Sequence, residues 1–521
     1  MRRLARAALL IAAVTAAARV MGFLRIAVFA RTVGTTPLGD TYQTANTLPN
    51  ILFEVVAGGA LAAAVVPVVA ASAEDRERTR AVVSGLLTWT VLLLAPVALT
   101  GMLLARPLTA LLVGGTADPA LRAAKVDVGA RMLVVFLPQV VLYGAGVVLS
   151  GALQAHRRFV GPALAPLLSS VVVIAVYVTY RLVAAAPGSL DGLTRGEELL
   201  LAAGTTAGVA VLSLSLLVPW RRLGLPLAPT LALPDGVAAR VRRLALAAVV
   251  GVVAQQLALA VVLRLCNVVP GAVVVHQIAF TVYLLPWAVL AVPVATAAFP
   301  ALSAASPARY ADVAAGALRT VLLAMAWAAA VLAATAWPVA SLVAGASPGA
   351  RTAPGEALPH AIVAFAPGLV GYGAVALLTR ALYARDRARA VAVATVAGFA
   401  VAALLAVLLA ARADAGDRVA AVGAANSAGM TVAGLLLAFA LARSAPGALR
   451  GAASTLALAV PVAGLAAACG AYAARVGPPV AGAALGAVVA TGVYALGTAR
   501  LPAARSAVGE VRGLLARRGA P

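Results

Sequence analysis

Long runs of apolar residues, separated by short polar or proline-bearing breaks, repeat along almost the whole chain. A helix needs about 20 apolar residues to cross the roughly 30 Å hydrocarbon layer of a bilayer. Runs of this length predict about fourteen spans, near residues 7–33, 45–72, 81–113, 127–153, 160–183, 198–220, 240–266, 270–302, 314–345, 357–383, 388–411, 418–442, 450–474 and 478–499. No run alternates like a barrel strand, so the pattern predicts an all-α integral membrane protein with about 14 transmembrane helices.

Composition supports lipid as the solvent of most of the chain. Of the 521 residues, 63% are hydrophobic and 11% are charged, and the mean hydropathy is +1.02, far from the usual soluble mixture. The short loops leave no room for a soluble catalytic domain, so we expect no enzyme, and without a glycine-rich phosphate loop we expect no cofactor. Cys266 and Cys469 lie in apolar segments without ligand spacing, which predicts neither a disulfide nor a metal site.

The net charge of +23 is divided into short arginine clusters between the apolar runs. This distribution argues against nucleic-acid binding, which favours one continuous basic surface. Nearly all the positive charge is arginine, and Lys125 is the only lysine, which we interpret as a compositional bias. Most of the 40 basic residues fall in the inner loops if the N-terminus is cytoplasmic, so a multi-pass protein with both ends in the cytoplasm is predicted.

The longest predicted inner connection, residues 220–243, carries three prolines and suits an extended linker between two lobes. A weak internal echo, in which Leu48-Pro49 and Leu285-Pro286 each lead an apolar stretch, favours two related halves. The predicted division is an N-lobe (1–222), a cytoplasmic linker (223–240), a C-lobe (241–443), two extra spans (444–500) and a basic cytoplasmic tail (501–521).

Charged side chains inside the first two spans are the main candidate chemistry, since each costs about 2.5–3.5 kcal/mol on insertion scales. Arg19 and Arg25 lie six residues apart, so they share a helix face only if the helix bends, which Gly22 between them permits. A guanidinium suits phosphate or pyrophosphate. We therefore expect the two arginines to bind an anionic group, with pairing to a carboxylate or capping of helix ends as the alternatives.

The second span carries a polar residue or glycine at every fourth position: Asn46, Asn50, Glu54 and Gly58. This spacing places them on one slowly drifting face, beside which Pro49 frees a carbonyl. We expect Glu54 to face Arg19 or Arg25 and to lower the cost of both charges. The remaining polar residues of the spans are expected to hydrogen-bond between helices; these are Gln255, Gln256, His276, Gln277, Asn426 and Ser427.

Several short motifs carry a family resemblance, most specifically over about the first 70 residues. They are Arg19-Val20-Met21-Gly22-Phe23-Leu24-Arg25, Gly39-Asp40, Leu48-Pro49-Asn50 and Gly58-Gly59-Ala60, running to Val66-Pro67. The stretch resembles the N-terminal signature of the MurJ (formerly MviN) lipid II flippases of the multidrug/oligosaccharidyl-lipid/polysaccharide exporter superfamily.

The resemblance implies two six-helix lobes in a V, a cationic cavity, two C-terminal helices that form a lipid-facing groove, and alternating access in the bacterial inner membrane. It implies that Arg19 and Arg25 bind the pyrophosphate of lipid II. We expect the polar-face residues Asn46, Asn50 and Glu54 to contribute to the same substrate site. Gly22, Asp40, Pro49 and Pro286 are expected to be structural or gating residues. The implied partners are lipid II or a related undecaprenyl-pyrophosphate-linked glycan, membrane lipids and cell-wall synthases.

The chain departs from the family pattern at Ile26, Phe53 and Thr281. The pattern has an acid at the first position and arginines at the other two, so two of four cavity arginines are missing. These losses favour a divergent, actinobacterial-type paralogue, and they leave open an exporter of another undecaprenyl-linked polysaccharide or of drugs, or a non-transporting cell-wall scaffold. The exact substrate, the coupling ion and the oligomeric state are left open as well.

Overall fold

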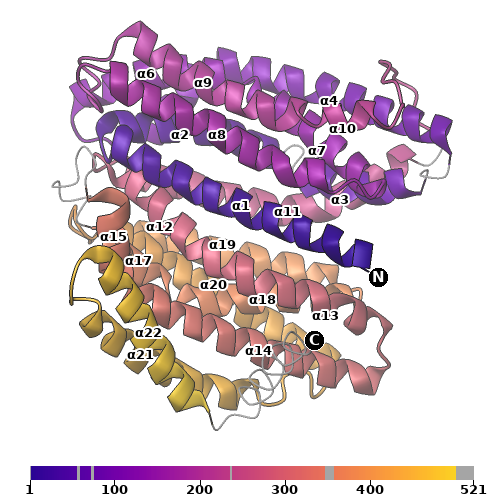
Figure 1. Ribbon diagram of the computed structural model, residues 1–521, viewed down its shortest axis with the longest axis vertical. Helices are drawn as coiled ribbons and strands as arrows, with labels where there is room; N and C mark the ends of the chain where they lie inside the picture. The colour runs from indigo at the N-terminus through magenta and orange to yellow at the C-terminus, as the bar shows by residue number, and fades with distance from the viewer. Residues whose placement is uncertain (1, 56–58, 72–74, 235–236, 346–356, 500–521) are drawn as a thin grey trace. The chain divides into compact units, whose positions relative to one another are not determined.

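The protein is all-helical in the residues that the computed structural model describes, which are 2–55, 59–71, 75–234, 237–345 and 357–499 (Figure 1). Within them, ten helices are long and apolar enough to cross a membrane, and eleven if the bent pair α17–α18 counts as one span. The predicted all-α membrane fold is confirmed, and the predicted count of 14 is compatible with this number. Chain contacts divide the protein into two compact units, Met1–Val274 and a second unit that begins at Val275.

The first unit contains eleven helices within the described residues. They are α1 (Arg2–Thr32), α2 (Pro37–Phe53), α3 (Gly59–Ala70), α4 (Arg76–Leu103), α5 (Ala105–Val113), α6 (Pro119–Phe136), α7 (Gln139–Ala155), α8 (Val160–Val183), α9 (Arg195–Leu214), α10 (Leu217–Arg221) and α11 (Val237–Cys266). Helix α11 packs against α3 and α5. The sequence placed this seventh span in the second lobe, whereas the compact unit extends through α11 to the first turn of α12.

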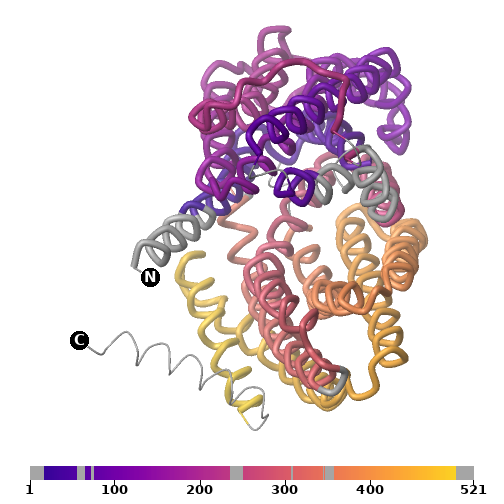
Figure 2. The backbone as a smooth tube through the Cα atoms, turned by 90° about the vertical axis from the view of Figure 1, so that its right-hand side faces the viewer, coloured from indigo at the N-terminus to yellow at the C-terminus, as the bar shows by residue number. Residues whose placement is uncertain are grey.

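The second unit is also helical throughout its described part. Its elements are α12 (Ala272–Pro286), η2 (Trp287–Ala291), α13 (Val292–Ala304), α14 (Pro307–Ala334), α15 (Ala336–Ala344), α17 (Leu358–Phe365), α18 (Gly368–Tyr383), α19 (Ala388–Ala410), α20 (Arg418–Ser444), α21 (Ala452–Ala473) and α22 (Pro479–Thr498). The last two helices pack against each other and against α14, and they form the yellow end of the tube in Figure 2.

Helix starts follow the capping chemistry of the sequence. Thr36 caps α2 by accepting a hydrogen bond from the Gly39 amide, and Pro37 occupies the first turn, where its missing N–H costs nothing. Helix α9 begins with a capping box in which Thr194 and Glu197 satisfy each other's backbone amides, an arrangement that removes two unpaired donors. Short polar breaks therefore set where the apolar helices begin.

Proline-bearing spans two and eight are both interrupted by π-helical turns. In span two the π turn begins at Glu54, just after α2, and in span eight η2 follows Pro286 directly. Proline removes an intrahelical hydrogen bond, and π turns accommodate the resulting break. The weak sequence echo around Pro49 and Pro286 thus corresponds to a shared irregularity of the backbone.

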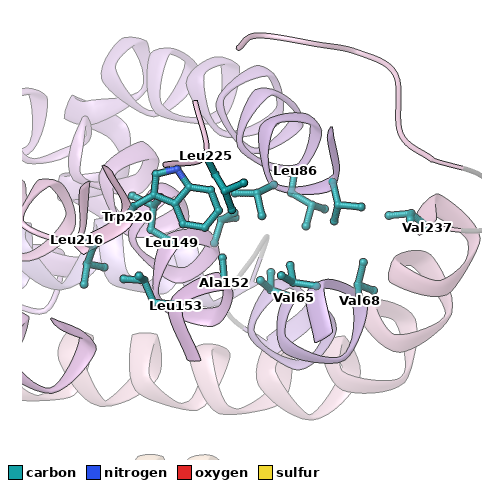
Figure 3. Packing of buried hydrophobic residues seen from close by; sticks show 14 of the residues in the cluster. Val65, Val68, Leu86, Leu149, Ala152, Leu153, Leu216, Trp220, Leu225 and Val237 are labelled. Atoms are coloured by element: carbon teal, nitrogen blue, oxygen red, sulfur yellow. The ribbon is translucent and has the colours of Figure 1, made fainter. Parts of the chain in front are cut away.

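The core of the first unit is a cluster of aliphatic side chains around the Trp220 indole (Figure 3). Val65 of α3, Leu86 of α4 and Leu149 of α7 belong to it, and Leu225 extends it beyond α10. Tight helix packing in the second unit uses glycine instead. A Cβ atom at Gly371 of α18 would lie 2.7 Å from backbone atoms of α20, the close approach that small residues permit in membranes.

Residues 225–234, here called the strap, form the described part of the predicted linker and are not helical. The strap is not a free tether, because it is hydrogen-bonded to α4. Ser84 and Thr88 accept from the amides of Ala228 and Thr230 at 3.3 and 3.1 Å, and the Trp89 indole donates to the Leu231 carbonyl at 3.1 Å. The attachment of the strap to α4 was not predicted from the sequence.

Candidate functional site

The two arginines of α1 have different surroundings. Arg19 is exposed and Arg25 is half-buried, on a helix that packs mainly against α8. One turn beyond Arg25, Phe29 contacts the rings of Tyr42 and Tyr177, each with ring centroids 5.1 Å apart. The second arginine therefore borders a tyrosine-rich part of the first unit.

The polar stripe of α2 is present in its described part. The Asn50 side-chain amide donates to the Asn46 carbonyl at 2.9 Å, while the buried Asn46 Oδ1 has no partner among the described residues. Glu54 is exposed at the start of the π turn, and Gly58 lies outside the described residues. A buried acceptor without a partner favours a donor from water or ligand.

The expected pairing between Glu54 and the arginines is not observed. Among the ion pairs of the described residues, none joins Glu54 to Arg19 or Arg25. The positive charge on α1 is therefore not cancelled by this carboxylate in the structure. Arginines inside a membrane protein without such a partner are candidates for binding an anion.

Phe53 is buried against Tyr143, with ring centroids 5.5 Å apart. The two rings also form part of the wall of a cavity of about 370 Å³ within the first unit, together with Ser150 and Gln154. Thr281 of α12 is half-buried and donates to its own helix, at the Gln277 carbonyl (2.8 Å). Both positions are thus integrated into local packing, and neither supplies a charge.

A buried tyrosine cluster in the first unit was not predicted from the sequence. The Tyr42 hydroxyl is 2.8 Å from that of Tyr177 and 2.6 Å from the Thr205 hydroxyl, which joins α2, α8 and α9. Phe29 stacks on the Tyr42 ring at 5.1 Å and Phe136 meets it edge-on at 5.6 Å. Aromatic residues alone gave no sequence signal, because they are also ordinary core residues.

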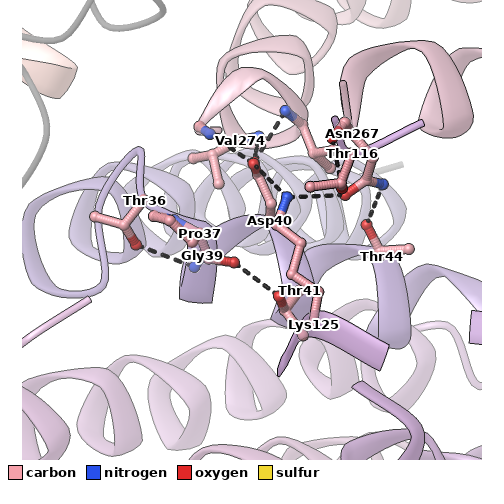
Figure 4. Close-up of polar contacts among 12 residues, drawn as sticks. Thr36, Pro37, Gly39, Asp40, Thr41, Thr44, Thr116, Lys125, Asn267 and Val274 are labelled. Carbon is pink, nitrogen blue, oxygen red and sulfur yellow. Dashed lines mark hydrogen bonds and ion pairs between the residues drawn. The ribbon is translucent and has the colours of Figure 1, made fainter. Parts of the chain in front are cut away.

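Asp40 is fully buried at the start of α2 and accepts hydrogen bonds from three backbone amides that open α12 (Figure 4). The donors are Gly271 at 2.5 Å, Val273 at 3.0 Å and Val274 at 3.3 Å. A carboxylate at this position caps the helix and complements its dipole. In the structure Asp40 thus caps the beginning of α12, and its structural or gating role stays a prediction.

Pro286 introduces the π turn of span eight, next to an aromatic column in the second unit. Tyr372 of α18 stacks on Trp287 at 4.7 Å and on Tyr283 at 6.0 Å. His276, one turn from the start of α12, stacks on Phe280 at 5.8 Å. Stacking of this kind contributes about 0.5–1.5 kcal/mol per pair beyond area burial, so the column holds the broken helix against α18.

Ser427 confirms the expected hydrogen bonding between helices. Its hydroxyl donates to the Ala364 carbonyl at 2.8 Å and accepts from the Gly368 amide at 3.1 Å. These backbone groups lie beside the break between α17 and α18, where the pair bends by 43°. A side chain of α20 thus satisfies backbone groups that the bend would leave unpaired in lipid.

Comparison with known families identifies the fold. Residues 29–477 match the family model described as "Lipid II flippase MurJ". The chain belongs to the lipid II flippase MurJ family. It is therefore a multi-pass membrane protein of the family that its sequence signature resembles.

Curated relatives from the MurJ family match over part of their length. The chain is 32% identical over 167 residues to the probable lipid II flippase MurJ of Rhizobium tropici, covering 31% of this chain and 30% of the relative. It is 29% identical over 180 residues to the lipid II flippase MurJ of Burkholderia cenocepacia, covering 33% of each. The chain thus spans about a third of the length of these relatives.

Solved structures show the same fold over nearly the whole chain. A lipid II flippase MurJ in an inward closed conformation superposes with a TM-score of 0.76 at 16% identity, covering 94% of this chain and 98% of that one. An inward-facing multidrug resistance MATE transporter gives a TM-score of 0.66 at 15% identity, covering 84% and 95%. The MurJ architecture is therefore kept despite low identity.

Proposed function

We propose that the protein moves lipid II, a lipid-linked peptidoglycan precursor, from the cytoplasmic to the outer face of the inner membrane by alternating access. Membership of the MurJ family supports this function. The observation that carries it is the pair of arginines on α1, which Glu54 does not neutralise in the described structure. Lipid II offers a pyrophosphate, and guanidinium groups bind such anions with charge-assisted hydrogen bonds.

In this proposal Arg19 and Arg25 hold the anionic head of the substrate, and the polar stripe of α2 lies beside it. The unpartnered Oδ1 of Asn46 accepts from a substrate hydroxyl, amide or water. Two guanidinium groups on one helix provide separate contacts to the two phosphates. The binding site therefore needs no metal or catalytic residue from this chain.

We further infer that both ends of the chain face the cytoplasm, with the strap on the same side. The distribution of arginine in the short loops supports this orientation. Lipid II enters from the cytoplasmic leaflet in this arrangement, where it is made, and leaves where cell-wall synthases consume it.

The proposal is tested by complementation of bacteria depleted of their own lipid II flippase, with lipid II accessibility at the outer face as the readout. The wild-type chain should restore accessibility, and Arg19→Ala with Arg25→Ala should abolish it at unchanged expression. Arg412→Ala is the matched control, because the hydrogen bond of this exposed arginine among the described residues is to the Leu408 carbonyl of α19. Full activity of the double variant would refute the assigned site.

A second candidate substrate is another undecaprenyl-linked glycan, and the buried ring of Phe53 favours it. The family pattern supplies a third positive charge at this position, whereas this chain packs Phe53 on Tyr143. A well-expressed chain that fails to restore lipid II accessibility, while its deletion in the source organism removes a surface glycan, would establish this alternative. Harmless neutralisation of both arginines with retained synthase binding would instead indicate a scaffold.

A further inference from the structure

Lys125 is the only lysine in a chain whose other 39 basic residues, of 40 in total, are arginine. Its side chain is completely buried in α6. A compositional bias toward arginine explains the scarcity of lysine elsewhere, yet it does not explain why one position keeps lysine. The exception therefore asks for a local chemical reason.

The Lys125 ammonium is enclosed by side chains of α2, of the connection between α5 and α6, and of the turn between α11 and α12 (Figure 4). Its Nζ is 3.6 Å from Asp40 Oδ2 and 3.4 Å from Asn267 Oδ1. Asn267 in turn donates to the Thr44 hydroxyl at 3.0 Å, and its carbonyl accepts from the Thr116 hydroxyl at 3.0 Å. All these side chains are buried.

This enclosure fits an ammonium and not a guanidinium. Lysine has three N–H donors, whereas arginine has five in a rigid planar fork. The acceptors recorded for Lys125 are one carboxylate oxygen and one amide oxygen, so an arginine would leave several buried donors unpaired. Each such donor would lose its hydrogen bond to water without a replacement, which explains why lysine is retained here.

The Asp40 carboxylate also requires the positive charge of Lys125. Asp40 accepts the three amides that open α12, and the positive end of the helix dipole alone offsets only part of a buried carboxylate's desolvation. Lys125 supplies the remaining positive charge without a route to water, because both side chains are 0% exposed.

We propose that Lys125 is a positioning residue that keeps Asp40 ionised as the cap of α12. The Lys125–Asp40 ion pair, which has no net charge, is here called the latch. The latch fastens the α11–α12 turn to α2 and α6. Because the compact first unit ends at Val274, within the first turn of α12, the latch holds this helix at the point where it leaves that unit. Breaking either charge releases the turn.

The release of the α11–α12 turn can be measured with a native cysteine of the chain. Cys266, the last residue of α11, is 1% exposed and adjacent to Asn267. Cys469 of α21 lies in the second unit and is half-buried, so it reports any general loosening. Maleimide labelling of the purified full-length protein in detergent, read for each cysteine by peptide mass spectrometry, needs no substrate and is independent of the proposed flippase activity.

The decisive variants are Lys125→Met, Asp40→Asn and the two together. Methionine keeps most of the volume of lysine, so the single change mainly removes charge. Each single variant should speed Cys266 labelling at least about tenfold, because an uncompensated buried charge remains. The double variant should return to within about threefold of wild type, since the neutral pair leaves no such charge and the asparagine oxygen still accepts from α12.

Labelling of Cys469 should stay constant in all variants. The proposal would be overturned if Cys266 in Lys125→Met were labelled at the wild-type rate. It would also be overturned if the labelling rate in the double variant rose by the two single increases combined. If Lys125→Met does not yield a monodisperse protein, recovery of one in the double variant supports the charge pair, and its failure refutes it.

Discussion

Replacing Gly85 with valine should detach the strap from α4. A Cβ atom at Gly85 would lie 2.7 Å from Leu233 Cδ2 and 3.0 Å from the Ala232 carbonyl oxygen. The leucine tip could swing away, but the carbonyl belongs to the backbone, and the second and third carbons of valine add to the clash. Valine itself suits a helix slightly better than glycine, by a few tenths of a kcal/mol, so any destabilisation arises from the strap.

The size of the effect follows from what the strap loses. Three hydrogen bonds join it to α4, each worth about 0.6 kcal/mol in a membrane protein. Part of the burial of Leu225 and Leu233 in the core cluster is lost as well, and the released backbone regains entropy that offsets some of this. A net cost of about 2 kcal/mol corresponds to a roughly 30-fold larger population with the strap released.

Elastase cleavage of the purified protein measures this population, because it cuts after small residues such as Ala232, which Leu233 follows. When opening is fast relative to cutting, the cleavage rate follows the open population, so Gly85→Val should be cut about 30-fold faster than wild type. Gly316→Val is the matched control, since nothing lies within 4 Å of a Cβ atom there. Equal strap cleavage in both variants and wild type would refute docking on α4.

Three smaller perturbations test other parts of the structure. Tyr42→Phe removes two buried hydroxyl contacts and should lower the free energy of unfolding of the detergent-solubilised protein by about 1–2 kcal/mol; no change in thermal midpoint would contradict this. Ser427→Ala leaves the Gly368 amide unpaired and should cost about 1–2 kcal/mol, seen as faster hydrogen exchange at that amide. Glu198→Gln breaks the bidentate contact with Arg131 (2.6–3.1 Å) and should lower the thermal midpoint at low salt, whereas an unchanged midpoint would show that the pair contributes nothing.

The helical membrane fold could be predicted from the sequence because lipid imposes a single strong rule. Backbone groups in the bilayer must be paired within each span, so the length of an apolar run almost decides the element. The observed helices α8, α19, α20, α21 and α22 coincide with predicted spans to within a few residues. Fourteen predicted spans are compatible with the ten or eleven that the described residues show.

Other features depend on contacts between distant segments and had no local signal. The compact unit extends through α11 because that helix packs on α3 and α5, whereas loop length suggested a boundary after residue 222. The strap looked like a free linker, because its three prolines indicate an extended chain. Prolines carry no signal for the segment against which such a chain packs. Its acceptors, Ser84 and Thr88, read simply as polar residues near the start of a span.

The partners of the charged residues could not be predicted from the sequence. Residue type and depth identified Arg19 and Arg25 as costly, and Asp40 was noted only through the family resemblance. For all three, the cost depends on a partner that the fold supplies. Asp40 receives Lys125, which lies 85 positions away and appeared only as a compositional exception. The arginines receive no carboxylate from Glu54, although spacing suggested one. A buried charge that is fully compensated stabilises one arrangement of helices, and a charge left uncompensated remains available to a ligand. We therefore propose opposite roles for them: Asp40 and Lys125 hold α12, and Arg19 and Arg25 bind the anionic substrate.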